Sequence, residues 1–205
     1  MLRYHARGVW DRSSSKRNRI RVTRTEGLAL SGSLRRASYN TAALRACQAL
    51  APEDMQIDIG SIADVPLYDA DRQAEGYPEA VLRLARQIAE ADALLFAMPE
   101  YNYSVPGTLK NAIDWVSRLQ PNPFAGKPAA IIGASSGMLG TARAQYHLRQ
   151  IGVYLDLRFL NKPEVMIGHA PERFDASGQL VHEPTRELLG KFLLALREWA
   201  LWHRR

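Results

Sequence analysis

From residue 27 onward, short apolar segments alternate with amphipathic helical segments, and no other feature of the sequence constrains the fold as strongly. The segments Ala93–Ala97 and Pro128–Ile132 are apolar throughout, as expected for strands that are buried on both faces. Strands that alternate with helices in this way predict a parallel sheet with right-handed crossovers, covered by helices on both faces. The sequence therefore predicts an α/β protein.

The apolar periodicity predicts where each element lies. Five strands fit the flavodoxin-like order 2-1-3-4-5, one of the doubly wound arrangements, so we expect a three-layer sandwich that forms one domain over residues 27–205. Residues 61–77, which include Pro66 and Gly76, predict a long loop. We expect strands at residues 28–30, 55–59, 93–97, 128–132 and 153–160, and helices at residues 40–50, 78–91, 106–119, 141–151 and 184–202.

The positive charge of the chain is concentrated near its N-terminus. Residues 1–26 contain eight basic and two acidic residues, which account for the whole formal net charge of +6. Blocks of like charge are usually solvated, and this block also contains Ser13–Ser15 and no apolar periodicity. We therefore expect a basic, disordered extension, or a start codon assigned too far upstream. An arm for nucleic acid or a membrane surface is a third interpretation, disfavoured because no aromatic stacking platform or folded basic face accompanies the charge.

Several absences in the sequence argue against other classes of protein. No apolar run approaches the roughly 18 residues that a transmembrane helix needs, and the N-terminus has no apolar region of a secretory signal. The single cysteine, Cys47, cannot form an internal disulfide and is expected to pack as a small hydrophobic residue. The histidines have no metal-binding spacing, and His147 is expected to be structural or interfacial. We expect a cytoplasmic protein without a metal, and without a nucleic-acid or membrane partner.

Three polar, turn-forming segments follow predicted strands, at residues 32–40, 99–107 and 134–137. In open α/β sheets, ligands bind beyond the carboxyl ends of the strands, near the point where the strand order reverses. The three segments follow the first, third and fourth strands, which are neighbours in the predicted order. The sequence therefore predicts one composite site built from three loops.

The first segment, Gly32–Asn40, connects a strand to the N-terminus of a helix. Free backbone N–H groups and the helix dipole favour a phosphate there. Ser33, Ser38 and Asn40 can add hydrogen-bond donors, and Arg35 can add a charge-assisted bond. Neither a G-x-G-x-x-G dinucleotide motif nor a Walker loop is present. The alternative is that Ser38 or Asn40 merely caps the helix.

The second segment, residues 99–107, is rich in aromatic and amide side chains between two prolines. Such a rigid loop suits a flat heteroaromatic ring, which needs a wall to lie against and donors at its edge. The alternative is a surface loop with hydrogen-bonded tyrosines. The third segment, Ala134–Gly137, offers small residues and backbone N–H groups that can approach the edge of a ring. Its alternative is a plain turn between a strand and a helix.

Five stretches of the chain resemble the NADPH-dependent FMN reductase family, and in particular its bacterial quinone and chromate reductases. They are GSLRRASYN (32–40), SIADVPLYDAD (61–71), PEYNYSVPGTLKNAIDW (99–115), GKPAAIIGASSG (126–137) and ARAQYHLRQ (142–150), and the resemblance covers essentially residues 27–170. It implies a flavodoxin-like fold and non-covalent FMN. It also implies that Ser33, Arg35, Ser38 and Asn40 hold the FMN phosphate, that Pro99, Glu100, Tyr101 and Asn102 line the isoalloxazine ring, and that Ser135, Ser136 and Gly137 reach its other side.

The resemblance implies an enzyme in which electrons pass from NADPH or NADH through FMN to small-molecule acceptors such as quinones, chromate, azo or nitro compounds and free flavin. The chemistry takes place at N5 of the flavin, so no catalytic side chain is expected. A preference for NADPH over NADH follows from the resemblance alone. The alternative is a flavodoxin-type electron-transfer protein. Such carriers are usually strongly acidic, whereas residues 27–205 have no net charge.

The resemblance also implies a homodimer or homotetramer, in which a second subunit helps to cover the exposed face of the flavin. The loop at residues 61–77 and the helix after Pro106 are candidates for the covering wall. We expect Arg143 and Glu164 to pair across a two-fold interface with Tyr146 beside them, because aromatic and charged side chains of this kind are typical of interfaces. The alternative is that all three are solvated side chains of one subunit.

Overall fold

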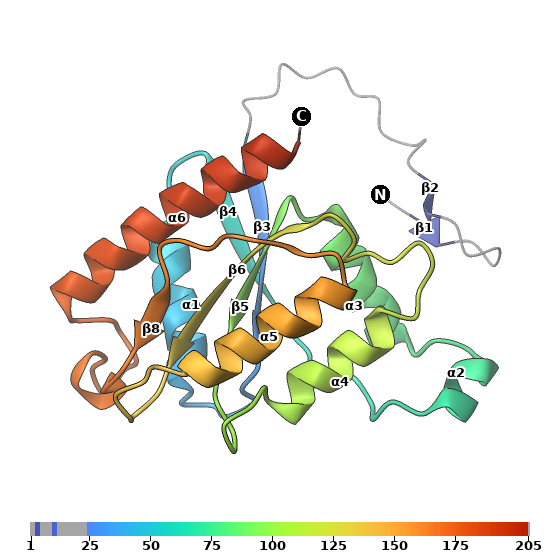
Figure 1. The fold of residues 1–205 in the computed structure, drawn as a ribbon, viewed down its shortest axis with the longest axis horizontal. Helices are drawn as coiled ribbons and strands as arrows, with labels where there is room; N and C mark the ends of the chain where they lie inside the picture. Colours follow the sequence, from blue (N-terminus) through green and yellow to red (C-terminus); the bar gives the residue numbers. More distant parts are fainter. Residues whose placement is uncertain (1–2, 5–9, 12–23, 205) are drawn as a thin grey trace.

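The computed structural model describes residues 3–4, 10–11 and 24–204 of the chain (Figure 1). Most of the predicted extension over residues 1–26 lies outside the described residues, so its disorder stays a prediction. Within it, β1 (Arg3–Tyr4) pairs with β2 (Trp10–Asp11) in an antiparallel ladder. The α/β domain follows.

A parallel sheet forms the middle layer of the domain. Its strands are β3 (Thr25–Ser31), β4 (Met55–Gly60), β5 (Ala93–Ala97), β6 (Pro128–Ala134), β7 (Arg158–Phe159) and β8 (Val165–Ile167). Their order is β4-β3-β5-β6-β7, and β8 also pairs with β6. Counted along the chain from β3, this is the order 2-1-3-4-5, so the predicted flavodoxin-like topology is confirmed.

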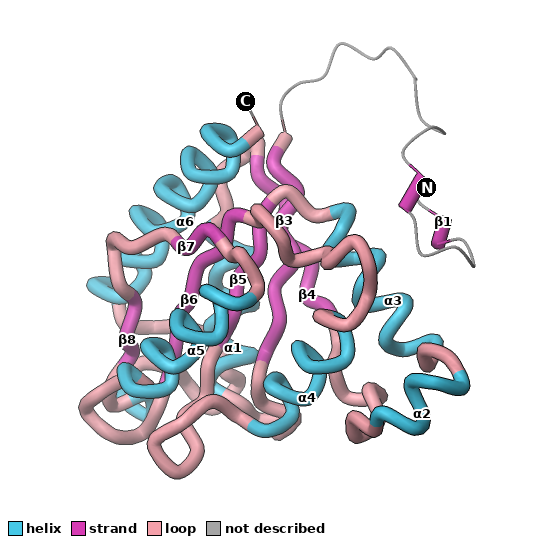
Figure 2. Tube along the Cα trace, turned by 45° about the vertical axis from the view of Figure 1, so that its right-hand side comes forward, coloured by secondary structure: helices cyan, strands magenta, loops and turns pink. Residues whose placement is uncertain are grey.

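Helices cover both faces of the sheet and complete the predicted three-layer sandwich (Figures 1 and 2). The described helical elements are α1 (Tyr39–Leu50), α2 (Ala70–Glu75), α3 (Glu79–Glu90), α4 (Gly107–Val116), α5 (Ala142–Tyr154), the 3₁₀ turn η1 (Ala170–Glu172) and α6 (Glu183–His203). Residues of α1 and α6 pack on one face of the sheet, and residues of α3, α4 and α5 pack on the other.

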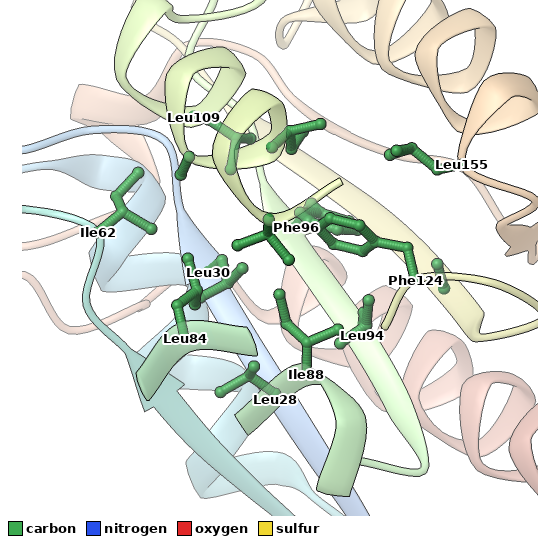
Figure 3. Close-up of a cluster of buried hydrophobic side chains, with 14 of the residues drawn as sticks. Leu28, Leu30, Ile62, Leu84, Ile88, Leu94, Phe96, Leu109, Phe124 and Leu155 are labelled. Atoms are coloured by element: carbon green, nitrogen blue, oxygen red, sulfur yellow. The ribbon is translucent and has the colours of Figure 1, made fainter. Parts of the chain in front are cut away.

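Each face of the sheet has its own hydrophobic core. Successive side chains of a strand point to opposite faces. In β5, Leu94 and Phe96 therefore join the core beneath α3, α4 and α5, whereas Leu95 joins the core beneath α1 and α6. Figure 3 shows the first of these cores, with Phe96 between Leu30 and Leu109. Every residue of β5 and β6 is buried, as their apolar sequences predict.

The prediction of one strand over residues 153–160 is wrong. Instead, α5 continues to Tyr154, and β7 and β8 share the fifth position of the sheet along β6. Val153 and Tyr154 have the side chains of typical strand residues, but they are 82% and 76% exposed on the last turn of α5. The helix approaches β7 closely at Gly152, where a Cβ would lie 2.1 Å from Phe159 Cε2.

The loop predicted at residues 61–77 contains the short helix α2. Asp69 is its N-cap, and Asp69 Oδ1 accepts the Asp71 N–H at 2.8 Å. No residue of α2 is buried. The apolar periodicity that predicts the longer helices is therefore missing here.

The first strand begins earlier than predicted, at Thr25. Thr25 is fully buried, and its N–H donates to the Asp54 carbonyl at 2.8 Å. Glu26 is exposed, which is why the beginning of the strand does not look apolar. The sheet therefore includes two residues that the sequence assigned to the extension.

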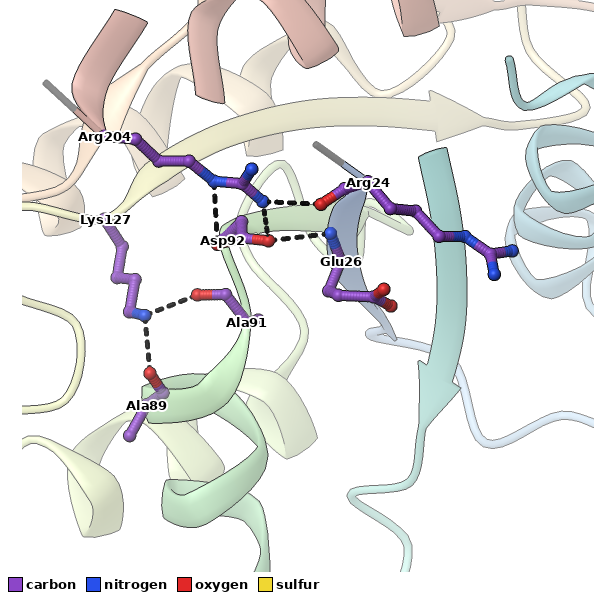
Figure 4. A network of polar contacts seen from close by, with 7 residues as sticks. All are labelled: Arg24, Glu26, Ala89, Ala91, Asp92, Lys127 and Arg204. Atoms are coloured by element: carbon purple, nitrogen blue, oxygen red, sulfur yellow. Dashed lines mark hydrogen bonds and ion pairs between the residues drawn. The ribbon is translucent and has the colours of Figure 1, made fainter. Parts of the chain in front are cut away.

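Asp92, in the turn before β5, contacts both ends of the domain (Figure 4). Its carboxylate accepts the Glu26 N–H at 2.8 Å and Arg204 Nε at 3.0 Å. Arg204 Nη2 also donates to the Arg24 carbonyl at 2.9 Å. The start of β3 and the end of α6 therefore meet at the amino-terminal edge of the sheet.

Candidate functional site

The three predicted loops lie at the carboxyl ends of β3, β5 and β6, on the lower edge of the sheet in Figure 1. We call residues 32–38 the first loop, residues 98–106 the second and residues 135–141 the third. The first loop is joined to β5 by the Gly32 N–H, which donates to the Ala97 carbonyl at 2.9 Å. The sheet therefore brings the three loops to one edge, as the strand order predicts.

Gly32 allows the first and second loops to touch. A Cβ at this position would lie 2.5 Å from Pro106 Cγ and 3.0 Å from Pro99 Cδ, so a larger residue would push the loops apart. The Thr108 hydroxyl, on the first turn of α4, donates to the Gly32 carbonyl at 2.9 Å. Pro99, one of the predicted ring-lining residues, is therefore buried against the first loop and helps to fix it.

The first loop offers donors at the N-terminus of α1. Ser38 is the N-cap, and its Oγ accepts the Thr41 N–H at 3.4 Å. Ser33 Oγ accepts the Arg35 N–H at 3.3 Å. Both serines keep a hydroxyl hydrogen to donate, because these bonds use only lone pairs of the oxygen. The Arg35 guanidinium lies 5.5 Å from the Tyr39 ring centroid and forms no ion pair within the part of the chain that the structure describes.

Asn40 connects α1 to the end of β6. Its Nδ2 donates to the Ala134 carbonyl at 3.0 Å, and its Oδ1 accepts the Ala134 N–H at 3.0 Å. The side chain is buried, and both ends of its amide are used in these bonds. What Asn40 can offer a phosphate is its backbone N–H in the first turn of α1, where helices leave such groups without an internal acceptor.

The second loop contains a tight hairpin, Tyr101–Ser104, which we call the aromatic hairpin. Tyr101 and Ser104 exchange two backbone hydrogen bonds, at 3.1 Å and 3.0 Å. Asn102 and Tyr103 form the turn with φ values of 51° and 65°, as a two-residue hairpin requires. Tyr101, Asn102 and Tyr103 are all exposed. The hairpin therefore presents two aromatic rings and an amide at the edge of the site.

Glu100 precedes the aromatic hairpin and binds the N-terminal end of α5. Its Oε1 accepts Arg143 Nε at 2.6 Å, and its Oε2 accepts the Ala144 N–H at 3.2 Å. The Glu100 side chain is only 8% exposed. Its charge is therefore neutralised inside the protein, and it serves the site by fixing the second loop.

The third loop is held by its own hydroxyl and by the strand beside it. Ser135 Oγ donates to the Gly137 carbonyl at 3.0 Å, and the Ser135 N–H donates to the Ile167 carbonyl at 3.0 Å. Ser136 and Gly137 are exposed. These small residues therefore leave their backbone accessible from solvent.

The segment after β8 supports the third loop, although no sequence pattern placed it in the predicted site. The His169 N–H donates to the Gly137 carbonyl at 3.2 Å. A Cβ on Gly168 would lie 2.4 Å from the Met138 carbonyl oxygen. The sequence signal is weak, because it consists of one glycine between a strand and a 3₁₀ turn.

Each predicted interface residue has a partner within the chain. Arg143 binds Glu100, whereas Glu164 Oε1 accepts the Tyr146 hydroxyl at 2.9 Å and Oε2 accepts Lys162 Nζ at 3.0 Å. Lys162 and Tyr146 hold the pKa of Glu164 below its usual range. A pair between Arg143 and Glu164 of two subunits stays a prediction, and it would require these partners to exchange.

Other chemically capable residues are buried or paired within the chain. Cys47 is fully buried, and burial raises the pKa of its thiol to about 12. Lys110 Nζ bonds both carboxylate oxygens of Asp114 at 2.8 Å, one helical turn away on α4. Among residues 3–4, 10–11 and 24–204, no group of three or more histidine, cysteine or acidic residues is arranged to hold a metal ion. None of the described helices is long and apolar enough to cross a membrane.

The donors fit a flat ring that carries a phosphate. A helix N-terminus, two serine hydroxyls and an unpaired arginine suit a dianionic phosphate. The aromatic hairpin and the exposed backbone of the third loop suit the sides of a heteroaromatic ring. Fold and site together define a flavodoxin-like flavoprotein.

Comparisons with known proteins agree with this class. The model of the NADPH-dependent FMN reductase family matches residues 26–172. An NAD(P)H-dependent FMN reductase of Pseudomonas aeruginosa is 58% identical over 172 residues, which cover 84% of this chain and 93% of the relative. A quinone reductase of Escherichia coli is 49% identical over 175 residues, with 84% and 93% covered. The structure of the flavoenzyme FerB, an NAD(P)H:acceptor oxidoreductase of Paracoccus denitrificans, superposes with a TM-score of 0.80 at 37% identity and covers 87% of this chain and 98% of its own.

The chain belongs to the NADPH-dependent FMN reductase family. It is an oxidoreductase that uses FMN as its cofactor and NAD(P)H as its electron donor. The family resemblance stated from the sequence is therefore confirmed, and the enzyme is favoured over the electron-carrier alternative.

Proposed function

We propose that the protein oxidises NAD(P)H and passes the electrons through FMN to quinones, at the edge of the sheet where the three loops meet. The observation that carries the proposal is the convergence of phosphate donors on the first loop with exposed aromatic and backbone groups on the second and third. Relatives named quinone reductases support the choice of acceptor. Chromate, azo and nitro compounds and free flavin form the wider acceptor range.

The first loop holds the FMN phosphate. Ser33 and Ser38 donate their hydroxyl hydrogens, Arg35 supplies a positive charge, and Asn40 supplies its backbone N–H. Charge-assisted hydrogen bonds of this kind are roughly twice as strong as neutral ones. The N-terminus of α1 adds its partial positive charge to the same point.

The second and third loops hold the ring. Tyr101 and Asn102 lie along one side, supported by Pro99 and Glu100 behind them. Ser135, Ser136 and Gly137 approach from the other side. FMN held by these loops would supply the hydride- and electron-transfer chemistry. The protein binds and orients the partners, and no side chain is assigned a catalytic proton transfer.

The active form is a homodimer or homotetramer in the cytoplasm. Among the exposed large apolar side chains are Leu67, at 83% in the loop before α2, and Tyr146, Val153 and Tyr154 along α5. Apolar side chains that gather on an exposed surface are typical of interfaces. A second subunit at these places would shield one face of the flavin.

Stopped-flow measurements on the FMN-loaded protein test the proposal. NADPH or NADH should bleach the flavin absorbance, and a panel of quinones should restore it within the turnover time. NADPH should act faster than NADH. A protein that binds FMN but does not pass electrons from either nicotinamide to any quinone would contradict the proposal.

A further inference from the structure

We propose that Arg143 and His147 are positioning residues, which hold the aromatic hairpin in the place where it contacts the flavin ring. The inference rests on the proposed function, because it takes the second loop as one wall of the flavin site. It assigns to α5, which the sequence associates with the subunit interface, a second role within one chain.

Arg143 and His147 contact the two ends of the hairpin from one face of α5. Residues four apart on a helix lie on the same face, and Arg143 and His147 have this spacing. Arg143 Nε donates to Glu100, directly before the hairpin, at 2.6 Å. His147 Nδ1 lies 3.0 Å from the hydroxyl oxygen of Ser104, the last residue of the hairpin. The helix therefore holds the hairpin at both of its ends.

Arg143 also contacts the turn of the hairpin, between Glu100 and Ser104. The Arg143 guanidinium carbon lies 3.5 Å from the centroid of the Tyr103 ring, within the range of a cation–π interaction. One arginine therefore contacts both the residue before the hairpin and its second turn residue. Because the Glu100 carboxylate is nearly buried, loss of Arg143 would leave a poorly solvated charge without its cation.

The backbone conformation of the hairpin explains why it needs contacts from α5. Asn102 and Tyr103 both have positive φ values, 51° and 65°. This conformation is uncommon for residues other than glycine, and a bulky side chain makes it less favourable. Strained backbone of this kind persists when surrounding contacts hold it in place. Without α5, the hairpin would lose the contacts that favour its turn.

Tyr101 and Asn102 are the two residues proposed to line the ring. They lie between Glu100 and Ser104, the residues that α5 contacts. They have no buried side chain of their own to fix them, since both are exposed. Their position therefore depends on Arg143 and His147. Release of the hairpin should weaken contacts with the ring and leave the phosphate contacts of the first loop unchanged.

Binding of two flavins separates ring contacts from phosphate contacts. Riboflavin has the same ring as FMN but lacks the phosphate. Arg143→Ala should raise the dissociation constants of both flavins by the same factor, about 10-fold for the loss of a charge-assisted bond. His147→Ala should raise both by about 3-fold. Bound FMN should become more fluorescent in both variants, because Tyr101 no longer quenches it at close range.

Arg149→Ala is the matched control. Arg149 is a cation on the same helix, but it binds Asn161 Oδ1 and the Leu160 carbonyl, each at 3.1 Å, away from the hairpin. The Arg149→Ala variant should leave the affinities for both flavins and the fluorescence of bound FMN unchanged. Arg143→Lys and His147→Gln should restore part of the affinity, since each keeps a donor for its partner.

The inference is overturned if Arg143→Ala and His147→Ala bind both flavins as tightly as Arg149→Ala, or if only FMN binding weakens. Should Arg143→Ala fail to fold, the comparison of His147→Ala with His147→Gln decides the question on the same measurements. A full-length wild-type protein that binds neither flavin would instead overturn the proposed function.

Discussion

The side-chain amide of Asn40 exchanges two 3.0 Å hydrogen bonds with the backbone of Ala134, and so connects the first turn of α1 to the end of β6. This pair joins α1 and β6, the elements that flank the first and third loops of the proposed flavin site, through buried groups. The residue predicted to donate to a phosphate is thus also the residue that holds two parts of the site together.

Asn40→Ala should destabilise the protein, because it leaves a buried N–H and a buried carbonyl of Ala134 unpaired. The free energy of unfolding should fall by about 3 kcal/mol, measured by urea titration without FMN. Asn161→Ala removes an exposed amide and should cost far less. Equal losses for the two variants would contradict the role of Asn40.

Arg35→Ala and Ser38→Ala test the phosphate assignment. The double variant should bind FMN about 10- to 100-fold more weakly, since a hydrogen bond to a charged group contributes about 1.5–3 kcal/mol. Riboflavin binding should be unchanged, because it has no phosphate. Arg36→Ala, in the same loop, controls for loss of charge. Unchanged FMN affinity in the double variant would rule out this phosphate site.

Shortening the chain tests where the domain begins. A chain that begins at Arg24 should keep its FMN affinity and its melting temperature. A chain that begins at Gly27 loses the bond between the Thr25 N–H and Asp54 and the bond between the Glu26 N–H and Asp92. Its unfolding free energy should fall by about 2 kcal/mol. If the two shortened chains melt at the same temperature, the start of β3 contributes nothing to stability.

Cys47 should be unreactive in the folded protein. Burial raises the pKa of its thiol to about 12. At pH 8 the group is therefore protonated, and the thiolate that reacts with disulfide reagents is scarce. A thiol titration should detect no group until denaturant is added, and one group afterwards. Rapid reaction under native conditions would show that α1 opens or that Cys47 is exposed.

Tyr146→Ala and Glu164→Gln test the assembly. The Tyr146 hydroxyl bonds Glu164 on the exposed side of α5, so either change alters the surface expected at the interface. Light scattering should show a shift from tetramer toward dimer, with FMN still bound. A wild-type protein that is monomeric and fully active would exclude the proposed assembly.

The sheet order could be predicted from the sequence because β5 and β6 are apolar throughout and the helices between strands are long and amphipathic. The strands at the fifth position of the sheet could not be predicted, because Val153 and Tyr154 resemble strand residues although they end a helix. The three loops could be placed because each follows a strand. The bonds from Asn40 to Ala134 and from Arg143 to Glu100 connect residues far apart in the sequence, so no local pattern reveals them.

The contact of Asp92 with both Glu26 and Arg204 places the start of β3 and the end of α6 side by side (Figure 4), at the edge of the sheet opposite the proposed flavin site. A tether at Arg204, or at Arg24 of a shortened chain, such as a linker to an electrode or to a partner enzyme that regenerates NAD(P)H, would therefore start at the edge of the sheet away from the loops. Immobilised in this way, the enzyme would keep its site open to substrates from solution.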